Sequence, residues 1–239
     1  MPLASPEPID TRPLFPPVSG SLVTLLRGLP SESWDRSTVA GAWVVRDVVA
    51  HLLDSTLRRL SFHRDGMTPP PPPNAIASER DFVAFINDLN AQSWAGEQAS
   101  EGWFDIGREF TELWHHQQQI RMAVGAASLA DPKYLAAVID VAIRGLPHAF
   151  RDVPAERGQT VAIDISGASG GQWTLLREAQ HWTLWRGEPS GVTSRIRLDD
   201  DTAWKLLFNA LTERDAPEAV LVEGSELGFA LLRARSVIV

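Results

Sequence analysis

The sequence predicts an α+β protein in two parts, a helical bundle over residues 1–152 and a small α+β domain with an antiparallel sheet over residues 153–239. In the first part, apolar residues recur with the period of a helix. From residue 160 onward they alternate with polar or small residues, which is the period of a strand. Between these patterns, residues 152–159 combine a proline, a glycine and charged side chains, a composition typical of a linker.

The helical part begins with a proline-rich lead-in, after which an amphipathic pattern predicts a first helix over residues 19–29, ending at Pro30. A stronger pattern predicts a second helix over residues 44–64. Its apolar stripe consists of Val45, Val48, Val49, Leu52, Leu53, Thr56 and Leu60. A polyproline spacer follows at residues 69–73, and it cannot be helical because proline lacks the backbone N–H.

Three more helices are expected before the linker. Residues 78–81 are typical of a capped helix start, and the helix that they begin should reach about residue 100. The next helix covers residues 105–124, with Gly125 just past its end. Asp131 and Pro132 supply an N-cap and a first-turn proline for the last helix, which extends to about residue 150.

In the second part, four segments have the alternation of strands and are expected to form a meander, and a shorter strand follows later. The glycine-rich residues 167–171 are interpreted as a hairpin turn, since they lack the lysine and the following helix of a phosphate-binding loop. The strands are expected at residues 160–166, 172–177, 181–186, 194–198 and 219–222, and two helices at residues 200–211 and 225–233.

Composition excludes several classes of function. The formal net charge of −8 argues against nucleic acid or an anionic membrane as the main partner. The chain has no cysteine, so it offers neither a disulfide nor a protein thiol as nucleophile or ligand. No apolar run approaches the length of a membrane span, and the N-terminus lacks the pattern of a signal peptide. We therefore expect a cytoplasmic protein, as a monomer or a small homo-oligomer.

The most informative motif lies in the predicted helix over residues 105–124. Glu112 and His116 are four residues apart, so their side chains lie one above the other on the same helix face. His51, in an apolar run of the helix over residues 44–64, is the obvious source of a third ligand. Two histidines and a glutamate form a ligand set that leaves a zinc position open for water or substrate.

Each of these residues also has a purely structural interpretation. A histidine in an apolar helical run is more often a core residue than a ligand, and a glutamate–histidine pair at this spacing is common on surfaces. Helical phase favours the metal hypothesis. His116 and His51 lie on the flanks of their apolar stripes, so two partly polar flanks can face one another inside a bundle. His115 falls well away from the stripe and is expected to face solvent.

The other histidines and the tryptophans are assigned structural roles. His63 lies at a fraying helix end, His148 late in a helix and His181 at a strand start. The nine tryptophans are interpreted as packing residues, with Trp114 in the bundle core and Trp43 just before a helix. An aromatic-lined ligand cavity between the two domains is the weaker alternative.

Four segments resemble a known family. Residues 43–52 read WVVRDVVAHL and residues 112–121 read ELWHHQQQIR. They resemble the two signatures of the DinB-like bundles, in the branch typified by mycothiol-dependent maleylpyruvate isomerase. Residues 170–175 (GGQWTL) and 201–204 (DTAW) are similar to that family's small C-terminal domain. The similarity thus covers nearly the whole chain in the same order.

The resemblance implies a DinB-like four-helix bundle and places the family's metal ligands on His51, Glu112 and His116. It also implies an isomerase or thiol S-transferase that uses mycothiol and acts on a small electrophile, such as a maleylpyruvate-like enone acid. A divalent metal, expected to be zinc, would favour the thiolate of this low-molecular-weight thiol. Where the family has an aspartate, this chain has Gln119, whose amide cannot act as a base.

No catalytic residue is assigned from the sequence. The candidates for binding substrate carboxylates are Arg195, Arg197, Arg233 and Arg235, and none of them is assigned that role. Two other functions are compatible with the motifs. One is a metal-dependent hydrolase, although no general base is evident once Glu112 is a ligand. The other is a non-catalytic protein that binds a metal or a small ligand, which Gln119 favours.

Overall fold

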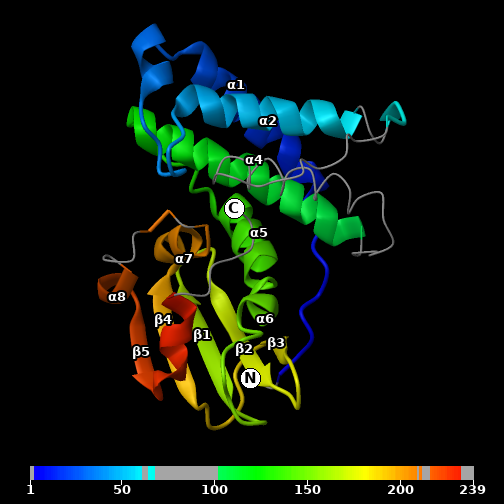
Figure 1. Cartoon of the computed structure of the whole chain (residues 1–239), viewed down its shortest axis with the longest axis vertical. Coiled ribbons are helices and arrows are strands. Elements are labelled where there is room, and N and C mark those ends of the chain that lie inside the picture. The colour runs from blue at the N-terminus through cyan, green and yellow to red at the C-terminus, as the bar shows by residue number, and fades with distance from the viewer. Residues whose placement is uncertain (1–2, 61–63, 68–101, 209, 212–215, 233–239) are drawn as a thin grey trace, which may run out of the picture.

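The computed structural model describes residues 3–60, 64–67, 102–208, 210–211 and 216–232, and over these it has the predicted α+β architecture. Helices of the N-terminal half lie at one end of the molecule and a five-stranded sheet lies at the other (Figure 1). The predicted helix over residues 78–100, the polyproline spacer and His63 lie outside the described residues. Among the residues that are described, no helix is both long and apolar enough to cross a membrane.

The first helix, α1 (Phe15–Arg27), begins four residues earlier than the sequence pattern predicts. Pro16 and Pro17 lie in its first turn, where backbone N–H groups have no acceptor in any case, so the lead-in prolines are compatible with the helix. Helix α4 (Gly102–Val124) agrees closely with its prediction. It ends at Gly125, whose φ of 69° is the left-handed conformation expected just past a helix.

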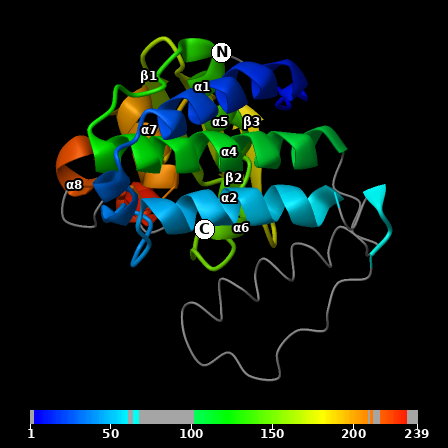
Figure 2. The same ribbon diagram turned by 90° about the horizontal axis from the view of Figure 1, so that it is seen from above.

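Helix α2 (Val45–Arg59) lies beside α4, and α1 lies on the other side of α4 in the view from above (Figure 2). Helices α2 and α4 run in opposite directions, as the packing of Val45 and Val48, near the start of α2, against Ile120, near the end of α4, shows. All three of these side chains are fully buried. The far end of the predicted α2 stripe is different, since Leu53 and Leu60 are exposed.

Two helices replace the single one predicted up to residue 150. Asp131 caps α5 (Pro132–Ile143) as expected, accepting a hydrogen bond of 3.1 Å from the backbone N of Lys133. A short helix α6 (Leu146–Ala149) follows after Arg144 and Gly145. Pro147 has no N–H to donate to the carbonyl of Ile143, and its ring would clash there, so α5 does not continue.

The sheet has the strand order β3-β2-β1-β4-β5. Strands β1, β2 and β3 form the predicted antiparallel meander. Strand β4, however, pairs with β1 in parallel, so the sheet is mixed and the prediction of an antiparallel sheet is wrong at this pairing. The strands are β1 (Thr160–Ser166), β2 (Gly171–Arg177), β3 (Trp182–Arg186), β4 (Ser194–Asp199) and β5 (Leu221–Gly224).

The parallel pairing arises because the chain crosses from β3 to the free edge of β1 instead of turning back beside β3. Gly187 and Gly191, both with positive φ, lie in this connection and permit its turns. Alternating hydrophobicity identifies a strand and its buried face, but it does not specify the neighbouring strand. Strand β5 begins two residues later than predicted.

One face of the sheet is apolar and covered by helices, and the other is charged. On β1 and β4 the apolar face carries Val161, Ile163 and Ile196, all buried. It packs against α5, α6, α7 (Asp200–Leu207) and a 3-10 helix, η4 (Glu226–Leu232), which replaces the predicted helix over residues 225–233. A short helix, α8 (Ala216–Ala219), precedes β5. The buried core continues from the N-terminal helices to the sheet, so a domain boundary after residue 152 stays a prediction.

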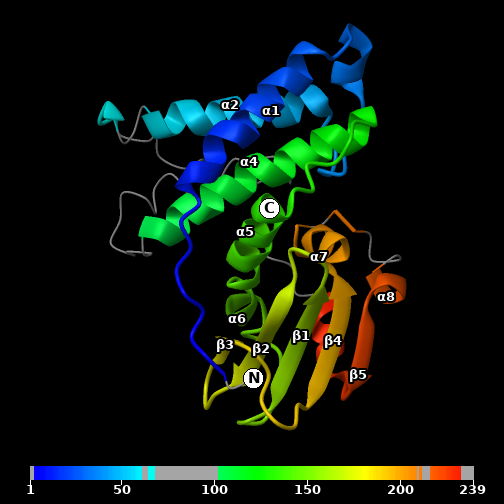
Figure 3. The same ribbon diagram turned by 180° about the vertical axis from the view of Figure 1, so that it is seen from behind.

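The N-terminal segment joins the two ends of the molecule, running from α1 down to the edge of the sheet (Figure 3). Ala4 and Arg186 of β3 exchange two backbone hydrogen bonds, of 3.0 and 2.8 Å. Arg144 donates to the carbonyl of Glu7 at 2.6 Å. Both arginines also contact the carboxylate of Asp140, at 2.7 and 2.8 Å, so that one buried carboxylate ties α5, β3 and the N-terminal segment together.

Asp199 caps helix α7 and gives a test of the local structure. Its Oδ1 accepts a hydrogen bond of 2.6 Å from the backbone N of Thr202, which lowers the pKa of Asp199 because the bond stabilises the ionised form. We expect Asp199→Ala to lower the free energy of unfolding by about 1 kcal/mol at pH 7.

Since the folded-state pKa is depressed, this contribution is present above the ordinary pKa of an aspartate and is lost as the pH falls through the lowered value. The difference between Asp199→Ala and the wild type should therefore shrink below about pH 4. Denaturant titrations at several pH values measure it, with Asp152→Ala, whose side chain is 84% exposed, as control. A loss independent of pH would show that the carboxylate does not act as the cap.

Candidate metal site

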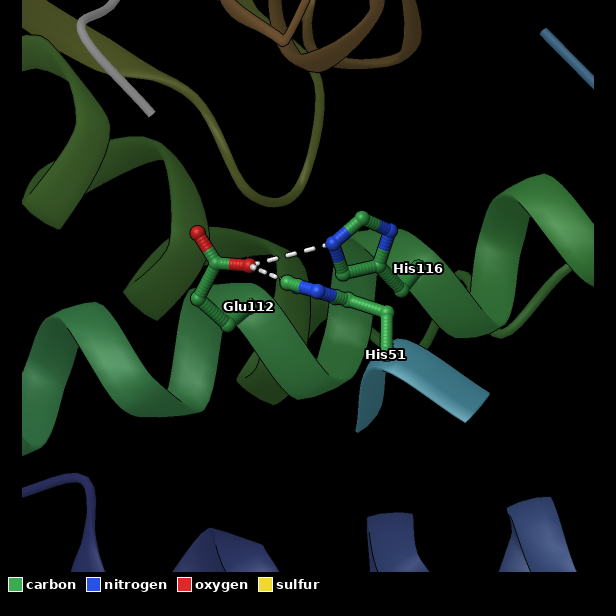
Figure 4. Close-up of side chains that lie close together, drawn as sticks. All are labelled: His51, Glu112 and His116. Atoms are coloured by element: carbon green, nitrogen blue, oxygen red, sulfur yellow. Dashed lines mark ion pairs between the residues drawn. The ribbon is translucent and has the colours of Figure 1, made fainter. Parts of the chain in front are cut away.

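The structure brings His51, Glu112 and His116 together (Figure 4). His51 projects from α2, and the other two project from α4. The Oε2 atom of Glu112 lies 3.1 Å from Nε2 of His116 and 3.9 Å from Nε2 of His51. One ligand atom from each residue lies within 4.8 Å of the other two, so the group could hold a metal ion.

The packing of α2 on α4 explains why these three meet. Glu112 and His116 share a face of α4 through their four-residue spacing. The contact of Val45 and Val48 with Ile120 fixes the position of α2 along α4. Because the helices are antiparallel, His51 then lies level with the Glu112–His116 turn.

The surroundings of His116 fit a metal ligand. Its side chain is only 3% exposed, and its Nε2 is buried without a hydrogen bond of normal geometry to any described residue, although Glu112 lies close by. A buried polar atom without a partner is costly, and such atoms are rare in native proteins. The nitrogen that would bind a metal is therefore the one that the fold leaves unsatisfied.

Gln119 contacts the other ring nitrogen of His116. Its Oε1 lies 2.7 Å from Nδ1 of His116. An amide oxygen can only accept a hydrogen bond, so a neutral His116 that binds a metal through Nε2 would carry its proton on Nδ1 and donate it to Gln119. This arrangement corresponds to the outer contact that orients histidine ligands in metalloproteins.

Glu112 is held in its ionised form. Desolvation acts to raise its pKa, but the imidazoles of His116 and His51 together outweigh this effect, and the pKa lies well below the ordinary value. The carboxylate therefore supplies one negative charge to the site at neutral pH. A negatively charged oxygen beside two imidazole nitrogens is a donor set that zinc and other divalent transition metals accept.

His115 is buried, and the prediction that it faces solvent is wrong. The residue is only 1% exposed, and its Nδ1 lies 2.9 Å from the carbonyl oxygen of Thr111. Its ring stacks on that of Phe208, with ring centroids 4.9 Å apart. Desolvation lowers the pKa of His115 to about 3, so it is neutral at pH 7. Helical phase identified one apolar stripe on α4, but Phe208, just after α7, covers this second side of the helix.

Trp43 is a site neighbour that the sequence did not identify. Its ring centroid lies 5.2 Å from that of His51 and 6.4 Å from that of His116. Its predicted role was packing alone, because Trp43 precedes α2 and so has no helical spacing that relates it to the ligands. The resembling segment 43–52, which begins with this tryptophan, was the available signal.

The other candidates lie elsewhere. His148 and His181 are exposed and take no part in the group of ligands. Arg195 and Arg197 lie on the face of the sheet that the helices leave uncovered, where they pair with Glu188 and Glu223 respectively. Arg233 and Arg235 lie outside the described residues.

Comparison with known proteins does not assign a family. No family model and no curated protein matches the sequence. A solved structure described as "UbiJ-SCP2 Ubiquinone synthesis protein" is similar to 45% of this chain and 97% of its own, with 11% identity and a TM-score of 0.31. A similarity at this TM-score supports no conclusion about the fold or function of this chain.

Proposed function

We propose that this chain is a metal-dependent, mycothiol-using enzyme, an isomerase or thiol S-transferase that acts on a small electrophile such as an enone acid. The observation behind the proposal is the group of His51, Glu112 and His116, with ligand atoms within 4.8 Å of one another. The thiol, and membership of the DinB-like four-helix bundles, rest on the two signature segments at residues 43–52 and 112–121.

In this proposal His51, Glu112 and His116 would hold zinc. When bound, the metal supplies an open coordination position at which a thiol loses its proton readily. Gln119 keeps the Nδ1 proton of His116 in place, and the ring of Trp43 covers the two imidazoles on one side. With a metal bound, the thiolate would add to the electrophilic carbon and leave a carbanion. Rotation about the former double bond and expulsion of the thiolate would give the isomer, whereas return of the proton that the thiol gave up to that carbanion would complete an S-transfer.

Arg108 favours an anionic substrate. It precedes Glu112 by four residues and so lies on the same side of α4. Its side chain is half-buried, and within the described part of the chain its guanidinium forms no ion pair. A divalent ion and this arginine would together form a positive site in a chain whose net charge is −8.

We therefore expect Arg108→Gln to raise KM for a carboxylate substrate by about 10-fold or more, because the substrate would lose one charge-assisted hydrogen bond. The metal content should not change, because Arg108 is not a ligand. Steady-state kinetics and metal analysis measure the two effects. Arg195→Gln, on the uncovered face of the sheet, is the matched control. An unchanged KM would remove Arg108 from the substrate site.

Metal analysis of the protein as purified, followed by titration with mycothiol, tests the proposed function. The expected result is one divalent metal per chain and, after exchange for cobalt, a sulfur-to-metal charge-transfer band when mycothiol is added. Turnover that is indifferent to mycothiol would favour a hydrolase.

Gln119, in place of a carboxylate, favours a second candidate function, that of a non-catalytic metal-binding protein. Bound metal without thiol binding or turnover would support this candidate. Protein without stoichiometric metal would overturn the proposal.

A further inference from the structure

The candidate metal ligands lie inside a continuous series of aromatic rings. Successive ring centroids are 5.2 Å apart from Trp43 to His51 and 4.8 Å apart from His51 to His116. The series continues from His116 to His115 at 4.0 Å and from His115 to Phe208 at 4.9 Å. It therefore begins before α2, crosses α4 and ends in the C-terminal half of the chain.

Helix α7 and the residue that follows it contact α4 at two adjacent positions. Trp204 meets Trp114 edge to face, with centroids 5.4 Å apart, and Phe208 stacks on His115. Trp204 and Phe208 are 2% and 3% exposed, so both contacts are fully desolvated. Through Phe208, this part of the chain reaches His115, whose ring in turn contacts the ring of His116.

The ring of His116 is held from two directions. Gln119 fixes its Nδ1, and the face of His115 lies against it. His115 is itself held by the carbonyl oxygen of Thr111, at 2.9 Å, and by the ring of Phe208. Without the ring of Phe208, His115 would be held only by its contact with the carbonyl oxygen of Thr111, and the contact between His115 and the ring of His116 would be loosened.

We propose that Phe208 is a positioning residue for the metal site, acting on His116 through His115. Metal binding by α2 and α4 then depends on the C-terminal part of the chain. The proposal rests on the metal site of the proposed function, but it requires neither the thiol nor the substrate. Loss of a group that contacts a ligand directly typically lowers metal affinity by 10- to 100-fold, and for Phe208, which lies one contact further out, we expect an effect at the lower end of that range.

Phe208→Leu tests the proposal, with Phe150→Leu as the matched control. Phe150 is equally buried, but it meets Trp182 of β3 edge to face, with ring centroids 5.5 Å apart, and so lies outside the ring series. Competition with a chelator gives the zinc affinity of the folded apoprotein, and the visible spectrum of the cobalt-substituted protein gives the ligand geometry. We expect Phe208→Leu to weaken zinc binding about 10-fold and to alter the cobalt spectrum. Phe150→Leu should lower stability but change neither readout.

Phe208→Tyr keeps the ring and should bind zinc as tightly as the wild type. If Phe208→Leu does not fold, His115→Leu takes its place in the test, because it removes the intervening ring and should show the same loss of zinc affinity. Wild-type zinc affinity in Phe208→Leu or in His115→Leu would overturn the proposal and leave the proposed function standing. A wild-type protein that binds no metal would overturn both.

Discussion

Glu112→Gln should weaken the binding of a divalent metal by more than about 100-fold, because losing a direct ligand costs at least as much as losing an outer contact. The substitution keeps the size of the side chain and removes the only anionic ligand of the group. His51→Ala should cause a similar loss, although His51 comes from a different helix. Metal content after gel filtration and chelator competition measure the effect.

The same variants should lose the stabilisation that metal gives to the folded protein. At a free metal concentration of about 100 times Kd, binding stabilises the native state by roughly 2.7 kcal/mol. Thermal melts with and without zinc should therefore differ for the wild type and coincide for Glu112→Gln. His148→Ala, which removes an exposed histidine, should behave as the wild type does. Equal zinc stabilisation in all of these proteins would mean that the metal binds elsewhere.

Gln119→Met should lower metal affinity by about 10- to 100-fold, since methionine has nearly the same shape but gives Nδ1 of His116 no strong acceptor. Without the hydrogen bond of 2.7 Å, the proton can occupy Nε2, where it competes with the metal. Gln119→Glu retains an acceptor and adds a charge, so it should bind metal at least as tightly as the wild type. Chelator competition compares the three proteins.

Gln118→Met is the matched control for Gln119→Met. Gln118 is also buried, but its amide bonds Ser128 and the backbone N of Leu129, away from the ligands. We expect this variant to lose stability and keep its metal affinity. If Gln119→Met and Gln118→Met bound metal equally well, the contact with Gln119 would have no role in the site.

Features with a local cause were predictable from the sequence. The bounds of α4 follow from a long helical period and from Gly125, and those of β1 follow from strict alternation. The direction of β4 was not predictable, because pairing with β1 depends on where a distant segment lies. The division of α5 from α6 was missed although Pro147 was its signal, since the apolar pattern continues through it.

In the candidate site, too, the features with a local cause were predictable and those that depend on distant contacts were not. Glu112 and His116 are related by one helical turn, and His51 was chosen as the histidine of an apolar helical run, a choice that helical phase then favoured. The environment of these residues depends on tertiary contacts. Trp43 lies before a helix, and Phe208 is ninety-two residues away from His116, so neither has a spacing that relates it to the ligands. His115 was placed in solvent for the same reason, because its stacking partner lies far along the chain.

The pairing of Ala4 with Arg186 has a consequence for the solubility of the protein. Strand β3 is an outer strand of the sheet, and a free outer strand offers unpaired N–H and C=O groups to a strand of another molecule. The N-terminal segment occupies part of that edge, and the proline at position 6 follows directly where pairing ends. Removal of residues 1–6 would expose this edge of β3 and favour aggregation through edge-to-edge association, while the metal ligands would be unchanged.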